Sequence, residues 1–239
     1  MGYIDIHSHI LPAIDDGAEN IDISIALLKQ EKENGISSVI CTPHFYAEAE
    51  ELEAHLAKCR TAYEALKEVA KNEDLPDIFL GHEVQYFTGI SKCTNLDMLC
   101  IEGTNILLLE LPFMTPLSEY MLKEVKSIDR NLGITVILAH IERYANDKLF
   151  KKLLKIIADG EAKGQINADS VLNQSSLKTV QKLIKHRYVS YIASDAHSPS
   201  VRPVLIKKAY SVLKEKYYTQ LVNIKKNTDR LERIVKKGD

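Results

Sequence analysis

Short apolar runs recur along the chain, and longer segments whose apolar residues follow a helical period separate them. Several of the runs are continuous Ile, Leu and Val rather than alternating apolar and polar, which is typical of strands covered on both faces in a parallel sheet. The pattern therefore predicts seven strands, over residues 3–7, 38–42, 78–83, 105–110, 135–140, 164–167 and 189–194.

The segments between these runs carry helix-boundary signals. Gly35 and Gly133 each follow a periodic segment, and Pro76 and Pro116 stand just outside two others. We predict helices over residues 22–34, 49–72, 117–131, 148–159, 176–186, 201–214 and, in the basic tail, 225–237. The alternation predicts an α/β fold with a mainly parallel sheet, either closed into a barrel or open and doubly wound. No linker or repeat divides the chain, so we expect a single domain over residues 1–239.

Composition narrows the classes of partner. The 239 residues carry a formal net charge of −2, which argues against nucleic acid as a partner. The longest apolar runs are too short to span a bilayer, and the N-terminus lacks the pattern of a signal peptide. The four cysteines have no Cys-x-x-Cys spacing, which favours free thiols over disulfides. We expect a cytoplasmic protein without membrane insertion, and the sequence leaves open whether it forms an oligomer.

Two pairs of potential ligands lie at opposite ends of the chain. His7 and His9 end the first apolar run, and Asp195 and His197 follow the last one. Residues two apart on an extended chain point to the same side, so each pair can aim two groups at one point. A fold that brings both pairs together would build a metal centre from strand ends.

Other predicted strands end in the same kinds of side chain. These strand-end residues are His44, Glu83, Glu110 and His140. In a barrel all such ends form one rim, where the active sites of these folds lie. A single histidine or glutamate is more often a hydrogen-bonded core residue or a helix cap, but the whole set in register favours a metal site.

The types of donor narrow the metal and the chemistry. Imidazole and carboxylate without thiolate suit manganese, iron or zinc, and the donors exceed what one ion needs. We therefore expect two or three ions, which together can activate water for phosphoryl or acyl hydrolysis. Arg143 and Arg202 follow two of the histidines closely, and a guanidinium suits bidentate binding of phosphate. The arginines favour a phosphoester over an amide as substrate.

These motifs together resemble a known superfamily. HSH at 7–9, TPH at 42–44, AH at 139–140 and SDAH at 194–197 are similar to the four motifs of the polymerase-and-histidinol-phosphatase (PHP) superfamily. Within it, the chain resembles the CpsB/YwqE type of bacterial tyrosine phosphatase, through HSHILP at 7–12, IDDG at 14–17, IERY at 141–144, QINA at 165–168 and RP at 202–203. The resemblance runs from residue 3 to about residue 215.

The resemblance implies a distorted (β/α)7 TIM-like barrel, the PHP fold, with three metal ions that are usually manganese; iron, cobalt or zinc are the alternatives. It also implies hydrolysis of phosphotyrosine on proteins, typically on the tail of a cognate bacterial tyrosine kinase that controls capsular or exopolysaccharide synthesis. By position, Arg143 and Arg202 would bind the phosphate in a catalytic role. The implied metal ligands are His7, His9, Asp16, His44, Glu83, Glu110, His140, Asp195 and His197. The adjacent Asp15 is the alternative to Asp16.

Three positions depart from the family pattern. Ala13 stands where relatives usually have Gly, and Ile141 where they usually have Pro. Both changes are expected to affect loop conformation rather than the identity of the ligands. His82 precedes Glu83 on a predicted strand, so its side chain should point to the opposite side, away from the site.

Two other functions remain open at this point. One is a small-molecule phosphatase of the same superfamily, similar to histidinol phosphatases. The other is a regulator without catalysis that binds the kinase tail. A cysteine-based tyrosine phosphatase is a poor alternative, because no cysteine of the chain is followed by the Cys-x5-Arg spacing that this chemistry uses.

Overall fold

A computed structural model describes residues 3–112 and 114–237, and its centre is a ring of parallel strands. The described residues form nine strands rather than seven, because two of the predicted strands are each interrupted. The strands are β1 (Tyr3–Ser8), β2 (Ile36–Cys41), β3 (His44–Phe45), β4 (Asp77–Leu80), β5 (Glu83–Gln85), β6 (Ile106–Glu110), β7 (Thr135–Leu138), β8 (Lys163–Asn167) and β9 (Tyr191–Ala193).

Hydrogen bonds between neighbouring strands keep the barrel continuous at the two interruptions. One sheet has the order β1-β2-β4 and the other the order β3-β5-β6-β7-β8-β9, with parallel pairing throughout. Pro43, which has no N–H to donate, lies between β2 and β3, and its carbonyl accepts from the amide of Glu83 at 3.0 Å. Ser8 at the end of β1 pairs in parallel with Ala196 just beyond β9. The predicted barrel is therefore confirmed, and the open doubly wound sheet is excluded.

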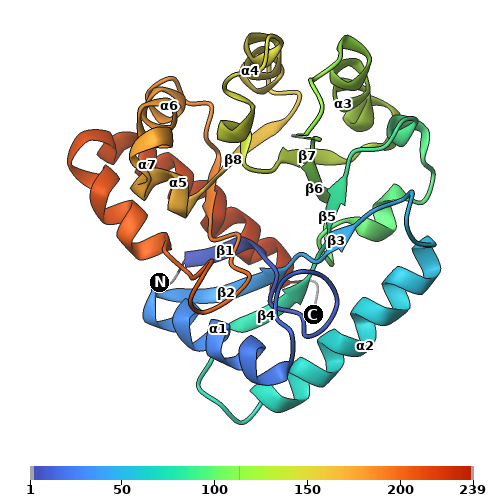
Figure 1. The fold of residues 1–239 in the computed structure, drawn as a ribbon, viewed down its shortest axis with the longest axis vertical. Coiled ribbons are helices and arrows are strands. Elements are labelled where there is room, and N and C mark those ends of the chain that lie inside the picture. The colour runs from blue at the N-terminus through green and yellow to red at the C-terminus, as the bar shows by residue number, and fades with distance from the viewer. Residues whose placement is uncertain (1–2, 113, 238–239) are drawn as a thin grey trace.

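Helices surround the strands on the outside of the barrel (Figure 1). Side chains cap three of them, because Asn20 accepts from the amide of Ile23, Ser118 from the amide of Met121 and Asn173 from the amide of Ser175. The helices are α1 (Ile21–Glu33), α2 (Leu52–Ala70), α3 (Glu119–Leu132), α4 (Phe150–Ala158), α5 (Ala168–Leu172), α6 (Gln174–Lys185) and α7 (Ile206–Val235). Short 3-10 helices occupy Ile90–Lys92, Leu96–Leu99 and Ile141–Tyr144.

Some predicted boundaries are wrong. Residues 201–205 are not helical, and the helices predicted over 201–214 and 225–237 are parts of one element, α7, which bends at Tyr217. β7 ends before His140, because the backbone of this residue turns into the left-handed region with a φ of 32°. The short helix α5 was not predicted. The predicted last helix ends two residues too late, since α7 ends at Val235. Residues 1–2 and 238–239 of the predicted single domain lie outside the described residues.

The interior of the barrel is apolar and is closed at the end opposite to the strand C-termini. Ile6, Leu108 and Ile137 belong to a buried cluster that fills the interior. Leu231 and Val235 from the end of α7 join the same cluster, so this helix covers the N-terminal ends of the strands. A second, larger cluster packs between the strands and the outer helices. The open end of the barrel is therefore the rim at the strand C-termini.

The cysteines agree with one of the expectations from composition. All four cysteines, Cys41, Cys59, Cys93 and Cys100, carry free thiols. None of the helices in the described part of the chain is both long and apolar enough to cross a membrane.

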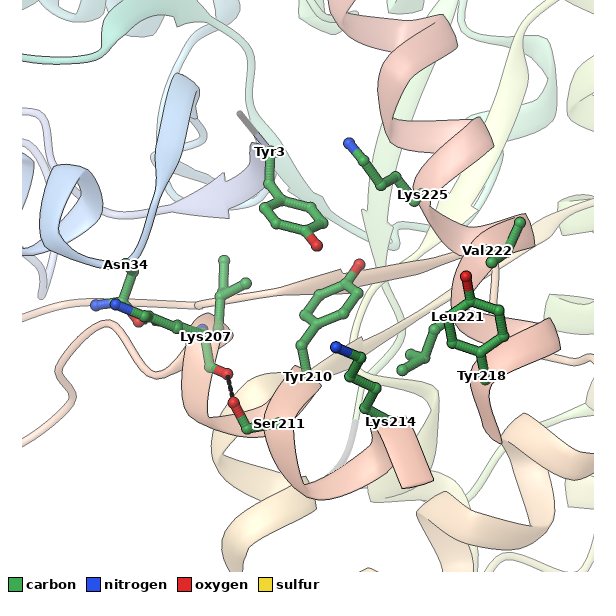
Figure 2. A pocket seen from close by; sticks show the side chains of 11 residues that line it. Tyr3, Asn34, Lys207, Tyr210, Ser211, Lys214, Tyr218, Leu221, Val222 and Lys225 are labelled. Atoms are coloured by element: carbon green, nitrogen blue, oxygen red, sulfur yellow. Dashed lines mark hydrogen bonds between the residues drawn. The ribbon is translucent and has the colours of Figure 1, made fainter. Parts of the chain in front are cut away.

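A pocket of about 420 Å³ separates the first part of α7 from its part after the bend. Figure 2 shows the rings of Tyr3 and Tyr210 side by side in it, with Lys207, Lys214 and Lys225 around them. The two ring centroids are 4.9 Å apart, so this contact ties the start of β1 to α7. The hydroxyl of Tyr210 is buried and has no hydrogen-bond partner among the described residues.

We predict opposite outcomes for removing two buried tyrosine hydroxyls. Tyr63 donates to the carbonyl of Ile78 at 2.9 Å, so Tyr63→Phe should lower the free energy of unfolding by about 1 kcal/mol or more. Tyr210→Phe should cause no loss, because that hydroxyl makes no bond that the substitution could remove. Urea unfolding curves of both variants test this, and an equal loss in the two would contradict it.

Candidate metal centre

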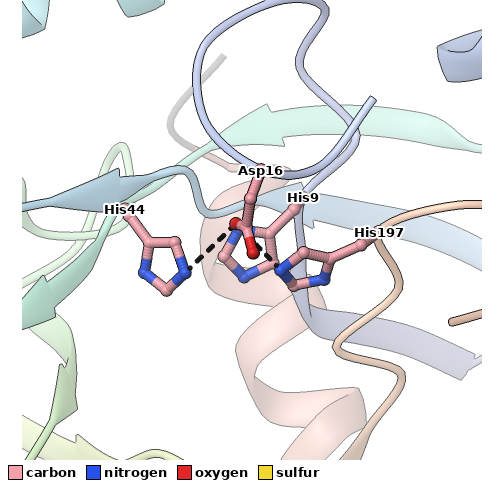
Figure 3. A group of neighbouring side chains, drawn as sticks. All are labelled: His9, Asp16, His44 and His197. Carbon is pink, nitrogen blue, oxygen red and sulfur yellow. Dashed lines mark ion pairs between the residues drawn. The ribbon is translucent and has the colours of Figure 1, made fainter. Parts of the chain in front are cut away.

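The rim of the barrel gathers every residue that the sequence predicted for the site. Most of these side chains are fully buried, whereas His44 is partly buried and Asp16 is exposed. Figure 3 shows how His9, Asp16, His44 and His197 turn toward one another from separate segments. Residues from β1, β3 and the segment after β9 thus meet at one place, although up to 190 positions separate them along the chain.

Glu83 lies at the centre of the cluster. Its Oε2 is 3.1 Å from His7 Nε2, 3.2 Å from His9 Nε2 and 3.1 Å from His44 Nδ1. Its Oε1 is 3.1 Å from His140 Nε2, which also lies 3.1 Å from Oε1 of Glu110. A carboxylate with different imidazoles at its two oxygens is well placed to bridge two ions.

Asp195 joins the two pairs from the ends of the chain. Its Oδ1 lies 3.4 Å from Nε2 of both His7 and His9, and 3.6 Å from Nδ1 of His197. The Nε2 atoms of His7 and His9 are themselves 3.2 Å apart, so this pair converges as predicted. The second pair converges for a different reason from the one predicted, because Asp195 has a φ of 51° and is not in extended conformation.

The loop after β1 separates the roles of the two neighbouring aspartates. Asp15 accepts from His9 Nδ1 at 2.7 Å and from the amide of His44 at 3.0 Å, so its carboxylate orients two other site residues. Asp16 instead points its Oδ1 to Nε2 of His197 at 3.2 Å and of His44 at 3.5 Å. Gly17 makes this loop possible, since a Cβ there would lie 2.2 Å from the carbonyl oxygen of His9. Asp16, rather than Asp15, therefore points a carboxylate oxygen toward the other donor atoms of the rim.

The donor set fits divalent metal ions. Three groups each place one donor atom per residue within 4.8 Å of one another: His9/Asp16/His44/His197, His7/His9/Asp195 and His44/Glu83/Glu110. His44 Nδ1, His140 Nδ1 and His197 Nε2 are buried without a hydrogen-bond partner among the described residues. Nδ1 of His44 lies 3.1 Å from Oε2 of Glu83, but the angles do not allow a hydrogen bond. This arrangement is expected when two side chains both point at the position of a metal ion instead of at each other. Nitrogen and oxygen donors of this kind suit manganese, iron and zinc.

Electrostatics divide the histidines into two kinds. Burial lowers the pKa of His197 to about 4, with His9 nearby as a further cause, so His197 is neutral and keeps a lone pair for a metal. Burial acts in the same direction on His140, but hydrogen bonds to carboxylates outweigh it and raise its pKa to about 9. Burial would raise the pKa of Glu83, yet its contacts with imidazoles hold that pKa well below the usual range. Glu83 therefore stays ionised and attracts cations.

Two amide side chains from β8 support the ring, and the sequence analysis gave them no role. Gln165 Oε1 accepts from the amide of His140 at 2.8 Å and lies 3.3 Å from Nδ1 of His7. Gln165 Nε2 donates to Asn167, whose own Nδ2 donates to Asp195 Oδ2 at 2.6 Å. Contacts of this type fix the tautomer and orientation of ligands. The signal was available, because Gln165 and Asn167 belong to the QINA motif at 165–168 that carries part of the family resemblance.

The two arginines lie at the mouth of the ring. Nη2 of Arg143 is 3.0 Å and Nη2 of Arg202 is 2.8 Å from Asp195 Oδ2, and both side chains are about one third exposed. They line a pocket of about 300 Å³ together with Tyr46, Met114 and several residues of the ring. Tyr46 stacks on His44 with an interplanar angle of 27°. The pocket thus has cationic donors beside aromatic and apolar walls.

Backbone conformation explains one departure from the family pattern. Ala13 has a φ of 57°, in the left-handed region that glycine adopts without strain, so relatives with Gly there have the residue that the turn favours. Ile141 is fully buried at the start of the 3-10 helix after His140. His82 faces away from the ring and contacts His55 on α2, as the strand alternation predicted.

Comparison with known proteins agrees with this site. The putative tyrosine-protein phosphatase CapC of Staphylococcus aureus is 29% identical over 233 residues, which cover 94% of this chain and 89% of that protein. The tyrosine-protein phosphatase YwqE of Bacillus subtilis is 27% identical over 226 residues, covering 91% and 86%.

Among solved structures, the fold matches one from a study of YwqE of Bacillus subtilis and CpsB of Streptococcus pneumoniae, described as metal-dependent tyrosine phosphatases. The TM-score is 0.78 at 26% identity, with 92% of each chain covered. A histidinol phosphate phosphatase from Lactococcus lactis shares the fold alone, with a TM-score of 0.58 at 15% identity over 90% of this chain and 93% of that one. The profile of the family described as "Capsular polysaccharide synthesis, CpsB/CapC" matches residues 3–231. This chain therefore belongs to the CpsB/CapC family.

Proposed function

We propose that this protein is a metal-dependent protein-tyrosine phosphatase whose active site is the ring on the barrel rim. The observation that carries the proposal is a buried set of imidazoles and carboxylates that converges beside two arginines at the mouth of one pocket. Membership of the family and the tyrosine phosphatases among the relatives support it.

The proposed metal ligands are the members of the ring: His7, His9, Asp16, His44, Glu83, Glu110, His140, Asp195 and His197. When bound, two or three divalent ions supply a hydroxide nucleophile from water and neutralise charge on the phosphoryl oxygens. We propose manganese as the ion, and its preference for these donors is shared by iron, cobalt and zinc. Asp15, Gln165 and Asn167 hold the ligands in place through their hydrogen bonds.

Arg143 and Arg202 bind the phosphate of the substrate in this proposal. Both guanidinium groups contact one oxygen of Asp195, which fixes their position at the pocket mouth. A guanidinium has five N–H donors in a planar fork, so it can keep one carboxylate contact and still bind two phosphate oxygens. The same charges stabilise the negative charge that develops in the transition state.

The walls of the pocket favour an aromatic phosphoester. Tyr46 and Met114 flank the arginines, and the side chain of Met114 is 84% exposed, so both can contact a phenyl ring. A phenol with a pKa of about 10 leaves as its anion with little need for a general acid. These two features support phosphotyrosine as the substrate over an alkyl phosphate.

The biological setting is also a proposal. The family's link to capsular polysaccharide synthesis supports a cytoplasmic protein with a bacterial tyrosine kinase as its partner, dephosphorylated on its tyrosine-rich tail. The free thiols of the four cysteines fit a reducing compartment. We further propose that residues 1–239 act as a single catalytic domain, since one barrel contains all the site residues.

Two alternatives have less support. A histidinol-phosphatase-like enzyme shares only the fold with this chain. A regulator without catalysis would not need a donor set that is complete and held by a further layer of hydrogen bonds.

We predict that the manganese-loaded protein hydrolyses a phosphotyrosine peptide faster than histidinol phosphate, because a phenolate leaves far more readily than the alkoxide of histidinol. EDTA followed by dialysis should abolish the activity, and added manganese should restore it. Phosphate release measured on both substrates tests this. Full activity after metal removal, or a preference for histidinol phosphate, would contradict the proposal.

Glu110→Gln should remove activity and metal together, because the substitution replaces a carboxylate ligand by a neutral amide of the same shape. The loss of activity should exceed the roughly 10- to 100-fold typical of changes outside the ligand shell. The matched control is Glu102→Gln, a surface residue that pairs with Arg60. Metal analysis and turnover of both variants test the role, and a Glu110→Gln variant with full metal content and activity would refute it.

Arg202→Lys should raise KM for a phosphotyrosine peptide by about 10-fold, equivalent to about 1.4 kcal/mol of binding. The substitution keeps the charge but loses the planar fork, and it should leave metal content unchanged. Arg130→Lys, on the exposed face of α3, is the control. An unchanged KM in Arg202→Lys would remove Arg202 from phosphate binding.

A further inference from the structure

A second group of ligand-type side chains lies away from the ring, between α2 and the segment that joins β4 to β5. His55 and Cys59 are one turn apart on the buried face of α2, and His82 follows β4. All three side chains are buried, with at most 2% of each residue exposed. One donor atom from each lies within 4.8 Å of the other two. The proposed phosphatase reaction uses none of them.

We propose that His55, Cys59 and His82 form a second metal site, which takes a single zinc-like divalent ion and is separate from the catalytic ring. His55 Nε2 is 2.9 Å from His82 Nδ1 and 3.5 Å from the sulfur of Cys59. Around a tetrahedral zinc ion, two nitrogens stand about 3.3 Å apart and a nitrogen and a sulfur about 3.6 Å apart. The two distances from His55 are thus within a few tenths of an ångström of those around such an ion.

A carboxylate outside the group supports the metal-binding form of His55. Glu50 Oε1 lies 3.0 Å from Nδ1 of His55, so this nitrogen carries a proton and Nε2 faces the other two donors as a lone pair. A carboxylate that holds a histidine in this way is a common neighbour of zinc ligands. His55 is fully buried at this contact, whereas Glu50 is partly exposed.

Binding of the ion requires the movement of two protons, one from the thiol of Cys59 and one between the two nitrogens of His82. The thiol of Cys59 loses its proton to solvent, because burial raises its pKa to about 12 and only a metal ion displaces the proton near neutral pH. The proton between the two histidines moves from Nδ1 to Nε2 of His82, so that imidazole stays neutral and Nδ1 is freed for the ion. The net reaction releases one proton for each ion bound.

The ion has a route into the site from the surface. His82 lines a pocket of about 480 Å³ together with Arg60 and Glu102, whose side chains are both partly exposed. Water from this pocket would provide the fourth ligand that a tetrahedral ion needs. The bound ion would tie α2 to the strand segment that ends in Glu83, and so would stabilise the rim from behind.

Sulfur distinguishes the two sites. The catalytic ring contains only nitrogen and oxygen donors, whereas Cys59 would provide a thiolate. Cobalt(II) reports this difference directly, because a thiolate bound to cobalt(II) gives a charge-transfer absorption in the near ultraviolet that imidazole and carboxylate do not give.

The test is the absorption spectrum of the full-length protein loaded with cobalt(II), together with metal analysis after dialysis. The wild-type protein should show the thiolate band, and Cys59→Ser should lose the band and about one bound ion per chain. Cys41→Ser, another fully buried cysteine outside the group, should keep both. Should Cys59→Ser fail to fold, His55→Gln provides the same comparison on the second ligand.

Two results would overturn the proposal. One is a cobalt-loaded wild-type protein that shows no thiolate band. The other is a band that persists at full intensity in Cys59→Ser. Either result would leave the three side chains as a hydrogen-bonded buried group. Because the readout is spectroscopic, it is independent of whether the ring hydrolyses phosphotyrosine.

Discussion

The contact between the ends of β1 and β9 is the constraint on which the candidate active site depends. The amide of His9 donates to the carbonyl of Ala196, and the amide of Asp195 donates to the carbonyl of His7, both at 2.9 Å. Behind them, the carboxylate of Asp5 accepts from both the amide and the hydroxyl of Ser194. These few bonds join the first and last strands of the barrel. Without them the two ligand pairs from the chain's ends would lie at opposite edges of an open sheet, and no single centre would contain both.

A ring of this composition needs positive charge to be stable. Glu83, Glu110 and Asp195 are buried side by side, and taking carboxylates out of water is costly unless cations or hydrogen bonds compensate. The contacts of Glu83 with imidazoles hold its pKa low, and Arg143 and Arg202 supply charge at the mouth. Divalent ions at the centre would complete this compensation. The same argument links stability to function, since the cations that offset the buried carboxylates are those that would activate water and bind phosphate.

The sequence predicted the barrel because apolar strands repeat so regularly, and it located the ring because ligand-type residues stand at strand ends. It could not predict the breaks between β2 and β3 at Pro43 and between β4 and β5 before Glu83, since these breaks depend on pairing with neighbouring strands. It left Asp15 and Asp16 unresolved, because adjacent carboxylates differ only in the partners that the loop gives them. The amides of β8 were overlooked for a related reason. A neutral side chain reveals its role only through the ligand that it touches, as Asn167 does with Asp195.

The most direct test of this account is a diffraction experiment on crystals of the manganese-loaded protein, with data collected on both sides of the manganese absorption edge. The account predicts two or three anomalous peaks inside the ring, with Glu83 in contact with more than one of them and Asp16 rather than Asp15 as a ligand. A single peak, or none, among these side chains would contradict it.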